Sequence, residues 1–154
     1  MSPFSQAVQC HNQPANRLNS SLIPLYDIDD ISDPTKSENK NIKAMIAMDA
    51  SWIQGELKID PRGLACFRMT GDSMEPLLRS EEIAVMHIKN RNLNEGVWCL
   101  RIDGTMMVRR VEPLARNKIR FSSVNKIYPP YVLSGKDLKT VEPVGRLIMT
   151  LHRL

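Results

Sequence analysis

The feature that most constrains the fold of this chain is a succession of short runs, each rich in residues that favour β-strands. Valine, isoleucine and aromatic residues fill these runs, as is typical of strands. The runs are LACFRM, EIAVMHI, VWCLRI, TMMVRRV, KIRFSS and, at the end, VGRLIMTLHRL. Asp103-Gly104 is a preferred two-residue turn, so we expect a hairpin there. Because strands do not alternate with helices, the chain is predicted to be mostly β, with strongly bent sheets.

Helical signals are weak and predict one or two short helices. The segment DASWIQGELKIDPRG is the best candidate, because Asp49 or Ser51 can cap it. Pro61 is expected to end this helix, since proline has no backbone donor. SLIPLY, which ends at Tyr26, is predicted to be an edge strand, where Pro24 is tolerated. Nothing before residue 49 supplies the successive amphipathic helices of a helix-turn-helix, so no DNA-reading unit is expected in this chain.

The composition favours one folded domain. The chain has 154 residues, of which 42% are hydrophobic and 25% charged. We expect a tail over residues 1–20 and a domain over residues 21–154, with an exposed loop at 27–41.

No run approaches the roughly 20 apolar residues of a membrane helix, and the opening is unlike a secretory signal. The three cysteines are odd in number and widely spaced, which indicates reduced thiols in a cytoplasmic protein and not a disulfide framework or a zinc site. No metal or cofactor is expected.

The positive charge of the chain leaves the question of nucleic-acid binding open. A net charge of +4 and a pI near 9.1 permit such binding but do not indicate it. The densest basic group contains Arg101, Arg109, Arg110, Arg116, Lys118 and Arg120. A solvated strand face explains this group as well as a phosphate-binding patch does.

The stretch MTGDSMEP, residues 69–76, raises a chemical question. Gly71-Asp72 predicts a tight corner, and Ser73 follows it directly. A serine becomes a nucleophile only when a neighbouring base takes its proton. The three histidines, His11, His87 and His152, are better explained as structural or exposed residues. A lysine could serve instead if burial lowers its pKa.

Several segments in a fixed order resemble the C-terminal domain of the LexA-like family, and most closely the repressors of temperate phages. The resemblance covers about residues 22–154. Its segments are SWIQGELKIDPRGLACFRMTGDSMEPLLRSEEIAVMHI, EGVWCLRIDGTMMVRRVE, FSSVNKIYPP and VEPVGRLIM. In that family the serine of a Gly-Asp-Ser-Met corner is the nucleophile, and a lysine after an Asp-Gly hairpin is the base. The pair cuts the protein's own linker, typically when the RecA filament stimulates it.

Two departures from the family pattern argue against self-cleavage. The resemblance puts Ser73 at the nucleophile position and Arg109 at the base position. An arginine does not give up its proton in a protein, so Arg109 is not a competent base. The resemblance makes the loop at 27–41 a degenerate cleavage loop, since the family's cleavage site falls near Ile31, Ser32 and Asp33, where this chain has neither a glycine nor a pair of small residues. We therefore expect Ser73 to be retained without activity.

The resemblance implies an oligomerisation and regulatory domain of a phage-type transcriptional repressor. A homodimer or higher oligomer is expected to form through the last strand. The expected interface residues are Val144, Arg146, Leu147, Ile148 and Met149. DNA contact is expected only through a DNA-binding head that this chain lacks. An antirepressor protein is the expected inducing partner, RecA is a less favoured one, and no membrane contact is expected.

Two alternatives stay open at this point. The first is an active Ser-Lys peptidase in which Arg109 is an engineered replacement of the lysine. The second is an accessory protein of a damage-response polymerase, which the UmuD-like branch of the family implies.

Overall fold

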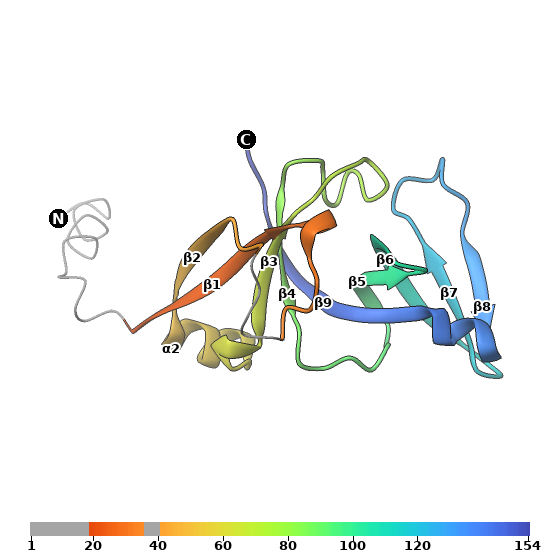
Figure 1. The fold of residues 1–154 in the computed structure, drawn as a ribbon, viewed down its shortest axis with the longest axis horizontal. Helices are drawn as coiled ribbons and strands as arrows, with labels where there is room; N and C mark the ends of the chain where they lie inside the picture. The colour runs from red at the N-terminus through yellow and green to blue at the C-terminus, as the bar shows by residue number, and fades with distance from the viewer. Residues whose placement is uncertain (1–18, 36–40) are drawn as a thin grey trace, which may run out of the picture.

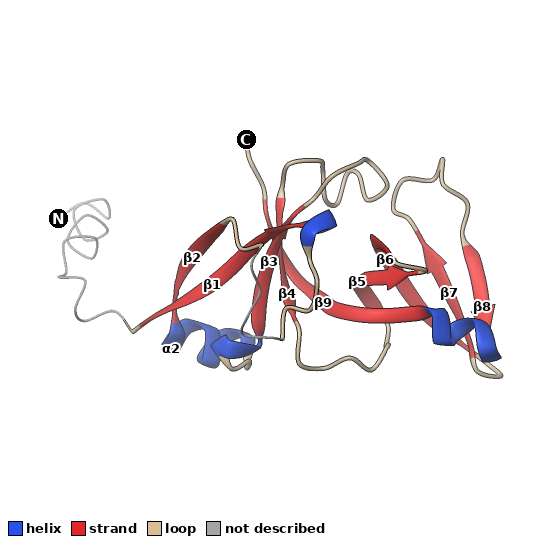
Figure 2. Ribbon diagram, in the orientation of Figure 1, coloured by secondary structure: helices blue, strands red, loops and turns tan. Residues whose placement is uncertain are grey.

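The computed structural model describes residues 19–35 and 41–154, and the strands of these residues form one nine-stranded sheet. The strands are β1 (Ser20–Asp27), β2 (Ala44–Asp49), β3 (Leu64–Arg68), β4 (Ile83–His87), β5 (Gly96–Ile102), β6 (Thr105–Leu114), β7 (Lys118–Ser122), β8 (Tyr131–Ser134) and β9 (Val141–Leu151). Their order is β2-β1-β3-β4-β9-β5-β6-β7-β8, and only β1 and β3 are parallel. Strands dominate Figure 2, which confirms the predicted mostly β fold.

The last strand, β9, joins the two halves of the sheet. Residues 141–146 pair with β5, and residues 146–151 pair with β4. In Figure 1, β9 curves across the front of the molecule from the β7–β8 side to the side of β1–β4. A single strand therefore connects the half that contains β6 with the half that contains β1.

Three clusters of buried side chains stabilise this sheet. The first includes Phe67, Met74 and Val108, and also takes in the short 3-10 helix η2 (Ile28–Asp30). The second, around Ile23 and Val85, lies between β1, β3, β4 and the helical segment. The third surrounds Trp98, Val111 and Phe121 on β5, β6 and β7. Apolar burial of this kind contributes most of the favourable free energy of folding.

The predicted helix is present but ends earlier than expected. It begins as α2 (Ala50–Trp52) and continues as the π-helical turn η3 (Ile53–Leu57). Asp49 caps it by accepting a hydrogen bond from the backbone N–H of Trp52 at 2.8 Å. Lys58 adopts a left-handed conformation with φ of 56°, which breaks the helical repeat before Pro61 is reached. Pro61 instead begins the 3-10 turn η4 (Pro61–Gly63).

The prediction that SLIPLY forms an edge strand is wrong. β1 lies between β2 and β3, and β2 occupies the edge of the sheet. Pro24 is tolerated because the pairing of β1 with β3 begins only at Leu25, so its missing N–H leaves no gap in that ladder. The predicted hairpin is confirmed: Asp103 and Gly104 have φ of 49° and 82° and connect the paired strands β5 and β6. The short strand β8 was not predicted.

Only part of the predicted tail and loop falls among the described residues. Of the tail over residues 1–20, Asn19 and Ser20 are described, and Ser20 already belongs to β1. The loop at 27–41 is described up to Thr35 and again at Asn41, and Cys10 and His11 lie outside the described residues. In the described segments, no helix is long and apolar enough to cross a membrane.

Candidate functional site

The corner that carries Ser73 is held by two buried side chains. Met74 and Leu78 are both completely buried, and the backbone N–H of Leu78 donates to the carbonyl of Met74 at 3.0 Å. Gly71 turns the chain with a φ of 85°, a conformation that favours glycine. Ser73 lies between Gly71 and these anchors and is partly buried. The turn at Gly71 and the apolar packing of the residues after Ser73 therefore set the position of its hydroxyl.

A second loop, between β7 and β8, is hydrogen-bonded to this corner. The backbone N–H of Asn125 donates to the carbonyl of Ser73 at 3.0 Å, and its side-chain amide donates to the carbonyl of Asp72 at 3.1 Å. The Tyr128 hydroxyl donates to Oδ1 of Asp72 at 2.6 Å. This hydrogen bond raises the pKa of Tyr128, because the neutral phenol is the form that donates. The backbone of the corner is therefore fixed from two directions.

Arg109 lies beside Ser73. It belongs to β6, where it is paired with the buried Trp98 of β5. Its Nη1 donates to Oγ of Ser73 at 3.3 Å and to its neighbour's carbonyl, that of Val108, at 2.7 Å. The structure therefore brings together the two residues predicted at the nucleophile and base positions. The guanidinium only donates hydrogen bonds, so this pair has no group that takes the proton of the serine.

The two described histidines are engaged elsewhere. Nδ1 of His152 lies 2.8 Å from Oε1 of Glu82, a buried carboxylate. A hydrogen bond from the backbone N–H of Arg79 lowers the pKa of Glu82. Burial lowers the pKa of His87, whose ring lies against Gly63. Within the described residues, neither histidine is hydrogen-bonded to Ser73.

The predicted cleavage region is held in place by an arginine of β5. Nη2 of Arg101 donates to the carbonyl of Ile31 at 2.7 Å and to that of Ser32 at 2.5 Å. Nη1 of the same guanidinium pairs with Glu142 of β9 at 3.1 Å. Ile31 is only 3% exposed and belongs to the same core cluster as Met74. Both the backbone and the apolar side chain of this region are therefore bound to the body of the domain.

Asp33 fixes the end of the same region. Its Oδ1 accepts from the hydroxyl and backbone N–H of Thr35 and from Nη2 of Arg91, at 2.6, 3.0 and 2.9 Å. The hydrogen bond from the Thr35 hydroxyl is the main reason that the pKa of Asp33 falls to about 2. Sequence reasoning missed the contacts of Arg91 and Arg101 with this region, because each arginine lies more than 50 residues from the segment that it binds and no local motif marks it.

The five residues predicted at an interface differ in their surroundings. Val144 is buried in the first core cluster, so its side chain offers no surface to a partner. Arg146 donates to the carbonyl of Glu95 at 2.9 Å. The other three, Leu147, Ile148 and Met149, line a shallow pocket of about 210 Å³.

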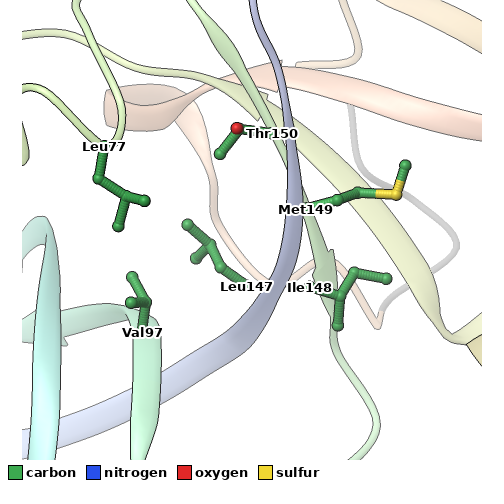
Figure 3. Close-up of a pocket in the computed structure, with 6 residues that line it drawn as sticks. All are labelled: Leu77, Val97, Leu147, Ile148, Met149 and Thr150. Carbon is green, nitrogen blue, oxygen red and sulfur yellow. The ribbon is translucent and has the colours of Figure 1, made fainter.

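That pocket collects apolar side chains from three separate segments. Figure 3 shows Leu77 from the Ser73 corner, Val97 from β5 and Leu147 from β9 converging on one side of β9. Ile148 and Met149 point to the other side and pack against the second cluster. A β-bulge causes this arrangement, because β9 has one more residue than β4 where Leu147 and Met149 pair with Met86 and Val85.

Comparison with known proteins shows the family to which this chain belongs. Residues 32–148 match the family described as Peptidase S24-like. The HTH-type transcriptional regulator PrtR of Pseudomonas aeruginosa is 30% identical over 84 residues, which are 53% of this chain and 33% of that protein. The chain thus spans about a third of the length of this relative. The matched residues include Ser73, Arg109 and most of β9. This chain belongs to the Peptidase S24-like family.

Proposed function

We propose that this chain is the oligomerisation and regulatory domain of a phage-type transcriptional repressor, and that it does not cleave itself. The observation that carries the proposal is the hydrogen bond from Nη1 of Arg109 to Oγ of Ser73 at 3.3 Å. The family match supports the peptidase-type scaffold, and the relative's name supports a role in transcriptional regulation. DNA contact is proposed to come from a DNA-binding head outside this chain.

The proposal that the chain does not cleave itself has two separate grounds. First, a serine attacks a peptide bond only after a base has removed its proton, and the guanidinium of Arg109 cannot act as that base. Second, the carbonyls of Ile31 and Ser32 accept hydrogen bonds from Arg101, and the side chain of Ile31 is buried. Releasing that segment toward Ser73 would cost these hydrogen bonds and the burial of Ile31.

The proposed homodimer rests on the surface around β9. Leu77 is 41% exposed, and it lines the same apolar pocket as Leu147. A two-fold interface needs only a surface that is complementary to itself. A dimer would join two DNA-binding heads, and the second head would then bind at a raised effective concentration. Induction would come from a small antirepressor protein, since self-cleavage is not available.

The proposal predicts that the purified chain is an intact dimer. Sedimentation equilibrium should give twice the mass of one chain, and Leu77→Glu should shift the protein to monomer. Leu22→Glu is the matched control, because Leu22 is an exposed leucine on β1, which β3 and β4 separate from β9 in the sheet. A monomeric wild-type protein, or equal effects of the two substitutions, would contradict the proposed interface.

Intact-mass spectrometry on the same preparation tests cleavage. The mass should be unchanged after incubation at about pH 10, where an ordinary lysine base loses its proton. It should also be unchanged after incubation with RecA filaments. A fragment that begins between Asp29 and Ser37 would show that the peptidase is active.

A further inference from the structure

Four arginines among the described residues are partly buried, and Arg109 differs from the other three because it has no carboxylate partner among these residues. The other three have carboxylate partners: Arg68 pairs with Asp27, Arg91 with Asp33 and Arg101 with Glu142. No carboxylate of the described residues lies within 4.0 Å of a nitrogen of Arg109. A partly desolvated cation without a counter-charge favours binding of an anion.

The donors of this cation are only partly used. Of the five N–H groups that a guanidinium carries, those of Nη1 bind Ser73 and the carbonyl of Val108. Burial raises the pKa of Tyr131, and the charge of Arg109 and a hydrogen bond with it act in the opposite direction, so the Tyr131 hydroxyl is a third partner of the guanidinium. The Ser73 hydroxyl accepts from Arg109, so its own proton remains free to be donated. Three partners do not use all five N–H groups, so guanidinium donors remain beside the Ser73 hydroxyl.

We propose that Ser73 and Arg109 form a binding site for a single carboxylate group. The guanidinium binds one or both carboxylate oxygens through its fork of donors, and the Ser73 hydroxyl donates to the same group. This inference rests on the proposed function in one respect: Ser73 acts as a hydrogen-bond donor and not as a nucleophile. The carboxylate comes either from the C-terminus of a peptide or from an acidic side chain.

The surrounding charges favour a carboxylate over a phosphate. Asp72 is adjacent to Ser73, and its carboxylate accepts from Tyr128 at 2.6 Å, which keeps a negative charge next to the site. The nearest arginine in sequence, Arg110, alternates to the opposite face of β6 and is exposed. One cation beside one fixed anion cannot balance the two charges of a phosphate. Binding of a monoanion is therefore expected to be weak, with a Kd of roughly millimolar order.

Titration of the isotope-labelled full chain by NMR tests the site. The ligands are acetate, a peptide whose only carboxylate is its C-terminus, a blocked peptide whose only carboxylate is an aspartate side chain, and inorganic phosphate. Ionic strength is held constant with chloride. The signals of the Arg109 Nε–H and the Ser73 backbone N–H should shift and saturate with the carboxylates. Tighter binding of one peptide than of acetate would support the site and identify the source of the carboxylate.

Four variants separate this site from general electrostatic attraction. Arg109→Gln should weaken acetate binding about ten-fold, because it removes the charge-assisted hydrogen bonds. Arg109→Lys should retain part of the affinity, and Arg110→Gln, the matched control, should leave it unchanged. Asp72→Asn should strengthen binding several-fold, because it removes the neighbouring negative charge.

Two results would overturn the carboxylate site. One is equal binding by the wild-type protein and a folded Arg109→Gln variant, and the other is tighter binding of phosphate than of acetate. Neither result bears on cleavage, which intact-mass spectrometry measures separately. Conversely, a cleaved wild-type protein would contradict the proposed function whatever its affinity for acetate.

Discussion

At the scale of single residues, the proposed loss of self-cleavage depends on Arg109. The corner is still fixed by Met74 and by the Asn125 loop, so the hydroxyl is presented as a nucleophile would be. The side chain next to it, however, stays protonated and donates a hydrogen bond to the oxygen that would have to attack. Under the proposed function, the geometry of the corner is not sufficient for activity, because the protonation state of the neighbouring side chain decides whether Ser73 can attack.

Replacing Arg109 by lysine is expected to make Ser73 reactive. A partly buried lysine can lose its proton and then take the proton of the serine. We expect Arg109→Lys to raise the rate of labelling by a fluorophosphonate about a hundred-fold above wild type, with the rate increasing toward alkaline pH. Labelling is measured by intact-mass spectrometry.

Two controls make this experiment specific. Arg109→Lys combined with Ser73→Ala should not be labelled, and Arg110→Lys should behave as wild type. Equal labelling of wild type and Arg109→Lys would show that the corner lacks another feature of an active site.

At the scale of elements, the segment after β1 is held by side chains from distant strands. Ile28 and Ile31 are buried in the first core cluster, while Arg101 and Arg91 bind the backbone and Asp33. Part of this segment therefore behaves as a packed element even though its composition is that of an exposed loop. The same contacts fix the region of the predicted cleavage site to the body of the domain.

Acid should loosen this segment. The pKa of Asp33 falls from 3.8 to about 2 on folding, so its carboxylate stabilises the folded state above pH 3.8. That contribution should be lost as the pH falls from 3.8 toward about 2, because protonation weakens the hydrogen bonds from Thr35 and Arg91. The NMR shift of the Thr35 backbone N–H, followed against pH, measures the transition. Asp33→Asn should abolish it, and a midpoint near 3.8 would contradict the prediction.

At the scale of the whole molecule, β9 is the element that both halves share. It pairs with β4 and with β5, and it passes between them where Gly145 packs tightly. A Cβ at Gly145 would lie 2.7 Å from Sδ of Met86 and 3.1 Å from the carbonyl oxygen of His87. The close approach of β9 and β4 therefore requires glycine at this position.

Gly145→Ala is expected to destabilise both halves together. Overpacking against the completely buried Met86 should lower the free energy of unfolding by about 1–3 kcal/mol. Equilibrium unfolding in urea should show one transition at lower urea concentration, since β9 couples the halves. Gly55→Ala is the matched control: a Cβ there has no neighbour within 4 Å, so stability should be unchanged or slightly higher. Equal effects of the two substitutions would contradict this role of Gly145.

Much of the fold and the central pair of the site could be predicted from local sequence. Short runs of β-favouring residues indicate strands, and Asp103-Gly104 indicates a hairpin, because both depend on backbone preferences of neighbouring residues. The cap at Asp49 is equally local. The pairing of Ser73 with Arg109 was predicted only through the resemblance to a family, since the two are 36 residues apart.

The sequence by itself determined the strand-rich character of this protein, its serine corner and the presence of an arginine where a base would be needed. The tertiary structure alone decided that β2 rather than β1 forms the edge, that Val144 is buried, and that Arg101 and Arg91 bind the segment after β1. It also decided that Arg109, unlike the other partly buried arginines, has no carboxylate partner among the described residues. Strand order and long-range ion pairs depend on which distant segments meet, and local preferences carry no information about that.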